Sequence, residues 1–392
     1  MKEKIDLICL PTSNLGGAER YLYNIALYSA KNNPGKTFVL VGSRGDNGSW
    51  EDLKKVANVV FFPAKRELTS LPFWIFFLIS YSAKYDVQYV LSSHAHINGM
   101  LSFLRRVRLI RPKFFISRES TVLEDRFSGA RLCFYRFIYK FLYGTQNIII
   151  CQTEYMKDRY SEGLLRSLAH KLRVLENPVN FSYIQSSLSN IQAQSVFSNL
   201  NHSGQPLDFK KIFDHSFVLG CACRLIDSKN VDSLVFAFKS IFDDCEGVVD
   251  GKDMKLLIVG DGESKSYLQT LVEDHGLQGS VFFLGRVEAP YWLYANFDVG
   301  VVPSLVEGFP NVLLEMMASG TKMLVTTPCA DGLQELPCVR VTKGFDADDI
   351  RAEILACISS KRDYSESYSE YSSKRSLDNF WNALDCHLSN VT

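Results

Sequence analysis

Short apolar runs alternate along the chain with longer stretches in which apolar residues recur every three or four positions. The runs predict buried strands, and the longer stretches predict helices with one buried face. In the first half, strands are predicted over 5–10, 38–42, 59–62, 87–92, 113–117 and 147–151. The helices predicted between them span 18–30, 71–84 and 97–106. Strands that alternate with helices favour a parallel sheet covered by helices on both faces.

The alternation pauses at 182–209, a segment rich in Ser, Asn and Gln that is typical of a linker or a solvated helix. It then resumes, with strands predicted over 217–223, 255–259, 281–284, 298–302 and 322–326 and helices over 230–242, 264–274 and 311–319. We therefore predict two Rossmann-like, doubly wound domains that face each other across a cleft. Their predicted limits are 1–180 for the first domain, 181–210 for a linker or insertion, 211–370 for the second domain and 371–392 for a helix that packs back on the first.

Composition excludes several classes of protein. Hydrophobic residues make up 46% of the 392 residues and charged residues 22%, values typical of a globular chain. Forty-three basic residues balance 43 acidic ones, which argues against a nucleic-acid-binding protein. The ten cysteines are scattered without a Cys-x-x-Cys pair, so we expect reduced thiols and no metal site.

The sequence also bears on location. Its first residues, MKEKID, carry charges where a signal peptide needs an apolar stretch. The nearest approach to a membrane span, 71–80, falls short of the roughly 18 apolar residues that crossing a bilayer requires. We therefore expect a cytoplasmic protein that touches a membrane at most from one side.

Ligands of parallel sheets bind at the carboxyl ends of the strands, so the residues at those ends are the candidates for chemistry. Gly16 and Gly17 follow the first strand, where glycine and a helix N-terminus admit a phosphate, although a plain tight turn would use the same residues. The spacing is not Gly-x-Gly-x-x-Gly, which disfavours a dinucleotide-dependent enzyme. In the second half, Arg224 and Lys229 follow a strand and suit a diphosphate, or else form a solvated pair of loop charges. Later strand ends carry Gly260, Gly262 and Arg286.

The most informative segment is SLVEGFPNVLLEMMASG, residues 304–320. Glu307 lies in a loop, and Asn311 is predicted to be the N-cap of the helix that carries Glu315. Carboxylates accept hydrogen bonds from sugar hydroxyls, and the backbone N–H groups of 309–312 accommodate phosphate. A capped helix with an ordinary exposed Glu is the alternative, but this segment offers groups for every part of a nucleotide sugar.

Together these residues resemble the retaining glycosyltransferases of family 4, which have the GT-B fold. The Glu-x7-Glu motif, Glu307 to Glu315, carries most of the resemblance. It extends over nearly the whole chain through the segments Gly16-Gly17-Ala18-Glu19-Arg20, Asn177-Pro178-Val179, Arg224 to Lys229, Gly260-Asp261-Gly262 and Phe283-Leu284-Gly285-Arg286.

The resemblance implies a role for each position. The first domain binds the acceptor, and the second binds the nucleotide-sugar donor. Arg224 and Lys229 hold the donor diphosphate and stabilise the leaving group, Glu307 contacts the sugar, and Glu315 holds the ribose. Neither a metal nor another cofactor is implied. The further donor-binding positions are Gly16, Gly17, Gly260, Gly262, Arg286, Gly308, Phe309, Pro310, Asn311 and Val312.

One position departs from the family pattern. Many relatives carry a His in the loop after the strand near 113–117, whereas this loop reads SREST. Arg118 or Glu119 could take over its catalytic contact with the sugar or the acceptor. The other candidates, at the end of the strand over 87–92, are His94 and His96.

Segment 105–143 is strongly basic in an otherwise neutral chain. It holds ten basic and three acidic residues as far as 140, and seven aromatic residues lie between 127 and 143. A basic, aromatic helix can lie on an anionic bilayer, so we predict that the first domain docks at the inner membrane. The alternatives are a core helix with a solvated basic face and RNA binding, for which no recognised motif is present.

We therefore predict a metal-independent, retaining glycosyltransferase without a nucleic-acid partner. It moves a sugar from a nucleotide sugar, with a UDP-sugar favoured, to a saccharide or lipid-linked acceptor. By resemblance, its setting is bacterial surface-polysaccharide assembly, which includes lipopolysaccharide, capsule and exopolysaccharide. The alternatives are a nucleotide-sugar epimerase of the same fold and a non-catalytic, sugar-nucleotide-binding scaffold at the membrane.

Overall fold

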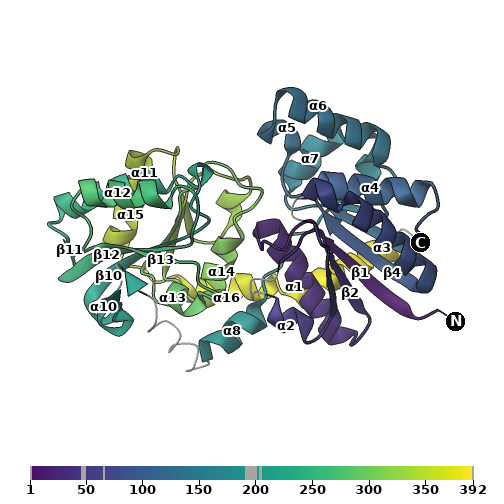
Figure 1. Ribbon diagram of the computed structural model, residues 1–392. Coiled ribbons are helices and arrows are strands. Elements are labelled where there is room, and N and C mark those ends of the chain that lie inside the picture. The colour runs from purple at the N-terminus through teal and green to yellow at the C-terminus, as the bar shows by residue number, and fades with distance from the viewer. Residues whose placement is uncertain (1, 46–49, 65–66, 190–200, 203–204, 391–392) are drawn as a thin grey trace. The chain divides into compact units, whose positions relative to one another are not determined.

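The computed structural model describes residues 2–45, 50–64, 67–189, 201–202 and 205–390. The chain divides into two compact units, Met1–Pro178 with Leu377–Thr392, and Val179–Ser376. Each unit contains one seven-stranded sheet among its described residues (Figure 1). The prediction of two parallel α/β sheets is thus confirmed.

The first sheet has the strand order β3-β2-β1-β4-β5-β6-β7, and every neighbouring pair in it is parallel. Its strands are β1 (Lys4–Leu10), β2 (Thr37–Val41), β3 (Asn58–Phe61), β4 (Asp86–Ser93), β5 (Phe114–Arg118), β6 (Ile148–Cys151) and β7 (Leu172–Val174). The carboxyl ends of parallel strands lie along one edge, so the segments that follow β1, β4 and β5 share that edge.

Helices cover both faces of this sheet. Its helices are α1 (Gly17–Asn32), α2 (Glu51–Lys54), η1 (Glu67–Ser70), α3 (Leu71–Lys84), α4 (Ala95–Arg106), α5 (Leu123–Arg126), α6 (Gly129–Phe137), η2 (Ile138–Leu142), α7 (Glu154–Glu162), η3 (Arg166–Lys171) and α17 (Leu377–Ser389). Alternate residues of β1 pack on opposite sides: Leu7 joins a core with α3 and α4, whereas Ile8 joins a core with α1 and α17. A third cluster lies beneath α6, η2 and α7 and includes Ile149 of β6.

The second sheet has the order β11-β12-β10-β14-β15-β16, with β13 paired to β12 as well. Only the pair of β11 and β12 in this sheet is antiparallel among the described residues. Its strands are β10 (Ser216–Ala222), β11 (Val248–Val249), β12 (Lys252–Val259), β13 (Val281–Gly285), β14 (Val299–Val302), β15 (Met323–Thr326) and β16 (Val339–Val341). A separate short pair joins β8 (Asn201–His202) to β9 (Gln205–Pro206).

Helices again pack on both faces of the second sheet. Leu219 of β10 joins a core with α11, α12 and α15, and its neighbour Val218 joins a core with α8, α13 and α14. The helices of this unit are α8 (Phe181–Ser189), α10 (Phe209–His215), η4 (Asp227–Lys229), α11 (Val231–Asp244), α12 (Lys265–Asp274), α13 (Tyr291–Ala295), α14 (Asn311–Ser319), η5 (Leu333–Glu335), α15 (Ala347–Ser360) and α16 (Ser365–Lys374).

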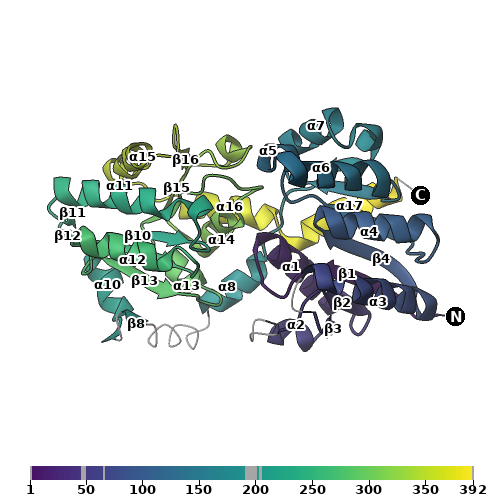
Figure 2. The same cartoon turned by 45° about the horizontal axis from the view of Figure 1, so that its top comes forward.

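Two of the predicted limits differ from the bounds of the helices in the structure. The segment 371–392 is not one helix, because α16 ends at Lys374 in the second unit and α17 begins at Leu377 in the first (Figure 2). The predicted linker 181–210 begins with α8, whose Ile184 is buried in the core of the second unit. The middle of that segment, 190–200, lies outside the described residues.

The two passages of the chain between the units run side by side. The backbone N–H of Val179 donates a hydrogen bond to the carbonyl of Arg375 at 2.8 Å, and Val179 forms a parallel bridge with Ser376. Among the described residues, no helix has both the length and the apolar character that a membrane span requires.

Candidate functional site

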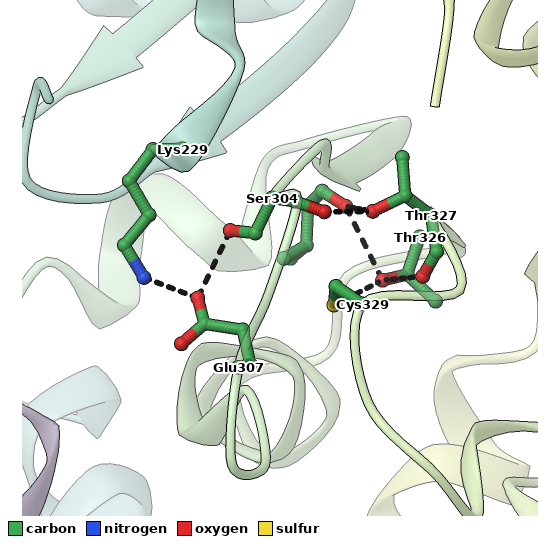
Figure 3. Close-up of polar contacts among 7 residues, drawn as sticks. Lys229, Ser304, Glu307, Thr326, Thr327 and Cys329 are labelled. Atoms are coloured by element: carbon green, nitrogen blue, oxygen red, sulfur yellow. Dashed lines mark hydrogen bonds and ion pairs between the residues drawn. The ribbon is translucent and has the colours of Figure 1, made fainter. Parts of the chain in front are cut away.

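The carboxylate of Glu307 is the centre of a polar cluster at the carboxyl edge of the second sheet. The Lys229 ammonium pairs with its Oε1 atom, and the Ser304 hydroxyl donates to the same oxygen at 2.9 Å (Figure 3). The side chains of Lys229 and Glu307 are each 20% exposed. Because both side chains are partly exposed, a charged ligand that reaches them can compete for either partner of the pair.

Two loops bring Lys229 and Glu307 together although they lie 78 residues apart. The N–H of Leu305, in the loop after β14, donates to the carbonyl of Ser228 in η4 at 2.9 Å. The N–H of Glu307 itself donates to the Cys329 carbonyl at 2.7 Å, in the loop after β15. The loops after β10, β14 and β15 therefore hold one another through backbone hydrogen bonds, which places the charged pair.

Gly260 and Gly262 are required by contact between two loops. Gly260 has φ +133°, and a Cβ atom there would lie 1.8 Å from the Cys223 carbonyl oxygen. A Cβ atom on Gly262 would lie 2.2 Å from the carbonyl oxygen of Leu225. From the sequence, we predicted that both glycines let the backbone approach a ligand closely. The structure shows that they also let the loop after β12 pack on the loop after β10.

Arg224 and Arg286 are the exposed cations of this edge among the predicted residues. The side chain of Arg224 is 66% exposed, and its Nη2 atom lies 3.4 Å from Glu263 Oε1. Such an exposed pair contributes little stability and separates easily when a phosphate competes for the guanidinium. Arg286 follows β13 directly and is exposed.

The helix α14 places the second half of the Glu-x7-Glu motif. The structure corrects one detail: Pro310 is the N-cap, and Asn311 is the first helical residue. No side-chain hydrogen bond caps this helix end. The backbone of 309–312, predicted to support the sugar and phosphate, forms this end of the helix and the loop before it. Glu315 lies one turn further along and is half-buried.

Phe309, between the two glutamates in sequence, contacts a residue that the sequence analysis did not select. The guanidinium of Arg375 lies 5.6 Å from the Phe309 ring centre and 4.7 Å from that of Tyr371. Arg375 is also the residue whose carbonyl accepts the hydrogen bond from Val179. No local pattern marks Arg375, because its role depends on two segments that meet only in the fold.

At the carboxyl edge of the first sheet, the structure brings the glycine loop and one of the two histidines together. Gly16 is the N-cap of α1, and Glu19 folds back so that a Cβ on Gly16 would lie 2.9 Å from Glu19 Oε2. The other oxygen of Glu19 lies 3.6 Å from His94 Nε2. His94 has φ 79°, a left-handed conformation that is costly for a side chain of this size and often marks a functional position. The rings of His94 and His96 lie 6.0 Å apart.

Arg118 is fully enclosed at the end of β5, with a relative exposure of 2%. Its guanidinium lies 4.0 Å from the ring centre of Tyr21, and its Nη2 atom donates to Asn177 Oδ1 at 3.0 Å. Burial lowers the pKa of Arg118, and the charges of Tyr21, Glu119 and Glu19 oppose that shift. Arg118 thus holds Asn177 next to the passage between the units.

Glu119, the next residue, is buried in a network of hydrogen bonds. Tyr139 donates to its Oε2 atom at 2.6 Å, and Tyr143 and Asn98 donate to Oε1 at 2.8 and 3.2 Å. Burial raises the pKa of Glu119 to about 7, and these hydrogen bonds together with Arg118 oppose the shift. Because buried side chains occupy both oxygens, we propose that Glu119 supports the first unit and does not contact the sugar.

The donors available for metal binding are limited. Within the described part of the chain, no group of three or more His, Cys, Asp or Glu side chains is arranged to hold a metal ion.

Ser304 and Glu19, like Arg375, were missed as site residues. Ser304 has a weak signal, since it begins the segment 304–320, and Glu19 stands within the quoted Gly16–Arg20 motif.

Part of the chain is similar to proteins of a known family. Residues 216–359 match the protein family described as "Glycosyl transferases group 1". The match lies within the second unit. An uncharacterised glycosyltransferase of Methanocaldococcus jannaschii is 28% identical to this chain over 228 residues, 58% of this chain and 50% of that relative. The capsular polysaccharide biosynthesis glycosyltransferase CapM of Staphylococcus aureus is 29% identical over 30% of each chain.

The chain thus spans half or less of the length of these two curated relatives. Solved structures match nearly all of it. HepE of Anabaena in complex with UDP-glucose has a TM-score of 0.72 at 19% identity, covering 98% of this chain and 100% of that one. WaaG, a glycosyltransferase involved in lipopolysaccharide biosynthesis, has a TM-score of 0.68 at 15% identity, covering 98% of each. At these identities, the likeness shows a shared fold.

Proposed function

We propose that this protein is a retaining glycosyltransferase that uses a nucleotide-sugar donor, with a UDP-sugar favoured, and a saccharide or lipid-linked acceptor. The observation that carries the proposal is the Glu307 cluster, in which Lys229 and Ser304 meet one carboxylate at the edge where ligands of such sheets bind. The match of residues 216–359 to a glycosyl transferase family supports it.

The proposed roles follow from the chemistry of each group. Lys229 and Arg224 stabilise the negative charge that grows on the diphosphate as its bond to the anomeric carbon breaks. The acceptor oxygen bonds to that carbon from the same face, and its proton leaves with the departing diphosphate. Glu307, released from Lys229 when the diphosphate binds, accepts hydrogen bonds from the donor sugar, and Glu315 holds the ribose.

The proposed setting is the assembly of a bacterial surface polysaccharide at the inner membrane. The names of the relatives support it, since CapM is described as acting in capsular polysaccharide biosynthesis and WaaG in lipopolysaccharide biosynthesis. HepE has been solved with UDP and with UDP-glucose, which makes UDP-sugars the first donors to test. A lipid-linked acceptor would lie at the anionic face of that membrane. The basic segment 105–143 is proposed to dock on the same face.

Donor binding and transfer are tested separately. Melting temperature is measured with UDP-, GDP- and ADP-sugars, because a ligand that binds only the folded protein raises it. Transfer is then measured for Glu307→Gln and Arg224→Ala, each expected to lower the rate by about 100-fold or more. Glu273→Gln, on the exposed side of α12, is the matched control and should transfer normally.

Three outcomes would contradict the proposal. Conversion of the donor without an acceptor would indicate an epimerase. Donor binding without turnover would indicate a scaffold. Transfer at the normal rate by Glu307→Gln would remove Glu307 from the site.

A further inference from the structure

We propose that α6 and η2 form a rigid membrane anchor, in which Phe134, Phe137 and Phe141 insert into the headgroup region of an anionic bilayer. The inference rests on the proposed function, because a lipid-linked acceptor would lie in such a membrane. It goes further by identifying the side chains that enter the lipid and the contacts that keep them facing outward.

The three phenylalanines form one exposed stripe, which we call the Phe stripe. Their side chains are 53%, 53% and 51% exposed, and none of the residues of α6 is buried. Spacings of three and four residues place them on one face of the helical segment. The rings of Phe137 and Phe141 lie 5.0 Å apart, so the apolar surface of the stripe is continuous there. A contiguous exposed apolar surface of this kind marks an interaction site in a soluble chain.

The opposite face of the segment is fixed by buried polar contacts. Ile138 and Tyr139 are buried, and the hydroxyls of Tyr139 and Tyr143 both donate to Glu119. Arg106 of α4 donates to the Phe141 carbonyl at 2.6 Å, which satisfies a carbonyl at the end of η2. The Phe stripe therefore cannot turn inward without breaking hydrogen bonds to a buried carboxylate.

Basic side chains lie on the same segment as the stripe, and the Lys140 ammonium lies 5.4 Å from the ring centre of Phe141. Arg131, Arg136 and Lys140 are exposed on the same segment, and α4 packs against η2 and continues into an exposed basic turn. The acidic residues of the preceding helix α5 are already paired, Glu124 with Arg136 at 3.6 Å and Asp125 with Arg159 at 2.7 Å. That turn, which follows the end of α4, contains Arg108 and Arg111 together with Val107 and Leu109, 46% and 48% exposed.

An anionic bilayer is the occupant that fits this surface. Lipid phosphate groups would form ion pairs with the exposed Arg and Lys side chains of the segment. The boundary of the acyl chains would accept the phenylalanine side chains. An acidic protein could pair with the basic side chains, but it would need an apolar stripe of its own to cover the Phe stripe. An RNA would pair with the same basic side chains and leave the three phenylalanine rings without an apolar partner. The combination of charge and exposed Phe therefore favours lipid over either macromolecule.

Vesicle co-sedimentation of the full chain tests the proposal. We expect binding to vesicles that contain phosphatidylglycerol and none to pure phosphatidylcholine, with binding falling as salt rises. The triple variant Phe134→Ser, Phe137→Ser and Phe141→Ser should bind at least about tenfold more weakly. The matched control, Phe236→Ser with Tyr267→Ser, removes two exposed aromatic side chains of the second unit and should bind normally.

The outcomes separate this inference from the proposed function. The triple variant should keep its donor-induced rise in melting temperature, because the Phe stripe lies in the other unit from Glu307. Normal vesicle binding by the triple variant, or no binding by the unmodified chain, would overturn the anchor and leave the transferase proposal standing. Tighter binding of an RNA oligonucleotide than of vesicles would also overturn it. A chain that binds vesicles but transfers no sugar would refute the proposed function alone.

Discussion

At the scale of single residues, several side chains serve the fold and the site together. Gly260 and Gly262 lie at the carboxyl edge of the second sheet, where a ligand is expected to bind. At each position a Cβ atom would also clash with a backbone carbonyl oxygen of the neighbouring loop. Glu119 occupies a position that the family pattern suggests for chemistry, but its environment is a buried set of hydroxyl and amide donors. A residue type at a strand end therefore predicts a site position, and its surroundings decide its role.

The buried Glu119 should make stability depend on pH. Its pKa is raised to about 7 in the folded chain from an ordinary 4.5, while burial keeps the neighbouring Tyr139 and Tyr143 protonated by raising their pKa values as well. Between those two pH values the unfolded chain has released the proton and the folded chain still holds it. The stability contribution is therefore complete below about pH 4.5 and is lost as pH rises through 7.

Urea unfolding at pH 5, 6, 7 and 8 measures this effect. The free energy of unfolding should fall from pH 5 to pH 7 and then level off. Asp6, whose pKa burial raises to about 6, adds a slope of the same sign. Glu119→Gln should therefore flatten the slope without abolishing it, and an unchanged slope in this variant would contradict the assignment.

At the scale of elements, the loop between Glu307 and α14 depends on a helix end far away in the sequence. Arg375 follows the last residue of α16, Lys374, and places its guanidinium over Phe309 and Tyr371. The same residue accepts a hydrogen bond from Val179, where the chain first enters the second unit. We propose that Arg375 is a positioning residue for the loop that carries Glu307 and Phe309.

Arg375→Met tests this positioning role, because methionine keeps an apolar stem and removes the cation. A half-buried cation–π contact contributes about 1 kcal/mol, so the KM for the donor should rise about fivefold while kcat changes less. Arg375→Lys should recover part of the loss. The neighbouring Lys374→Met, which removes an exposed pair with Glu370 at 2.6 Å, is the control and should leave KM unchanged. Equal KM values for both Met variants would refute the role.

At the scale of the whole molecule, the chain builds two separate cores and closes the first with its last helix. Leu377, Phe380, Leu384 and Leu388 of α17 are all buried in the core that contains α1 and β1. Tyr28 of α1 donates to Asp378 at 2.6 Å, which adds a polar contact at the edge of this packing. The first unit is therefore complete only when the C-terminal residues have been added to it.

Phe380→Ala should destabilise one unit selectively. Removing a buried phenylalanine side chain costs about 3–5 kcal/mol, through lost burial and the cavity left behind. Hydrogen exchange should show weaker protection of β1, β4 and α1, while the strands of the second sheet keep theirs. Equal loss of protection in both units would show that they unfold as one. Leu355→Ala, in α15 on the core of the second unit, should give the opposite pattern.

The sequence by itself predicted both sheets and the strand edge at which we place the candidate site. Apolar periodicity reports local burial, so it predicted the long central strands, but it missed β7 and β16, each only three residues long. It also located the basic, aromatic helix near 130–143, although the last part of that segment is the π-helix η2. The end of a strand can be located in the sequence because the apolar run gives way there to the turn-forming residues of the next loop.

Only the tertiary structure decided which side chains meet. The pairing of Lys229 with Glu307, the enclosure of Arg118 and Glu119, the contact of Arg375 with Phe309 and the return of α17 to the first core all join residues distant in the chain. Such contacts depend on how loops fold against one another and on which neighbours exclude water. Neither property is encoded in a short window of sequence, because both are set by the packing of the entire unit.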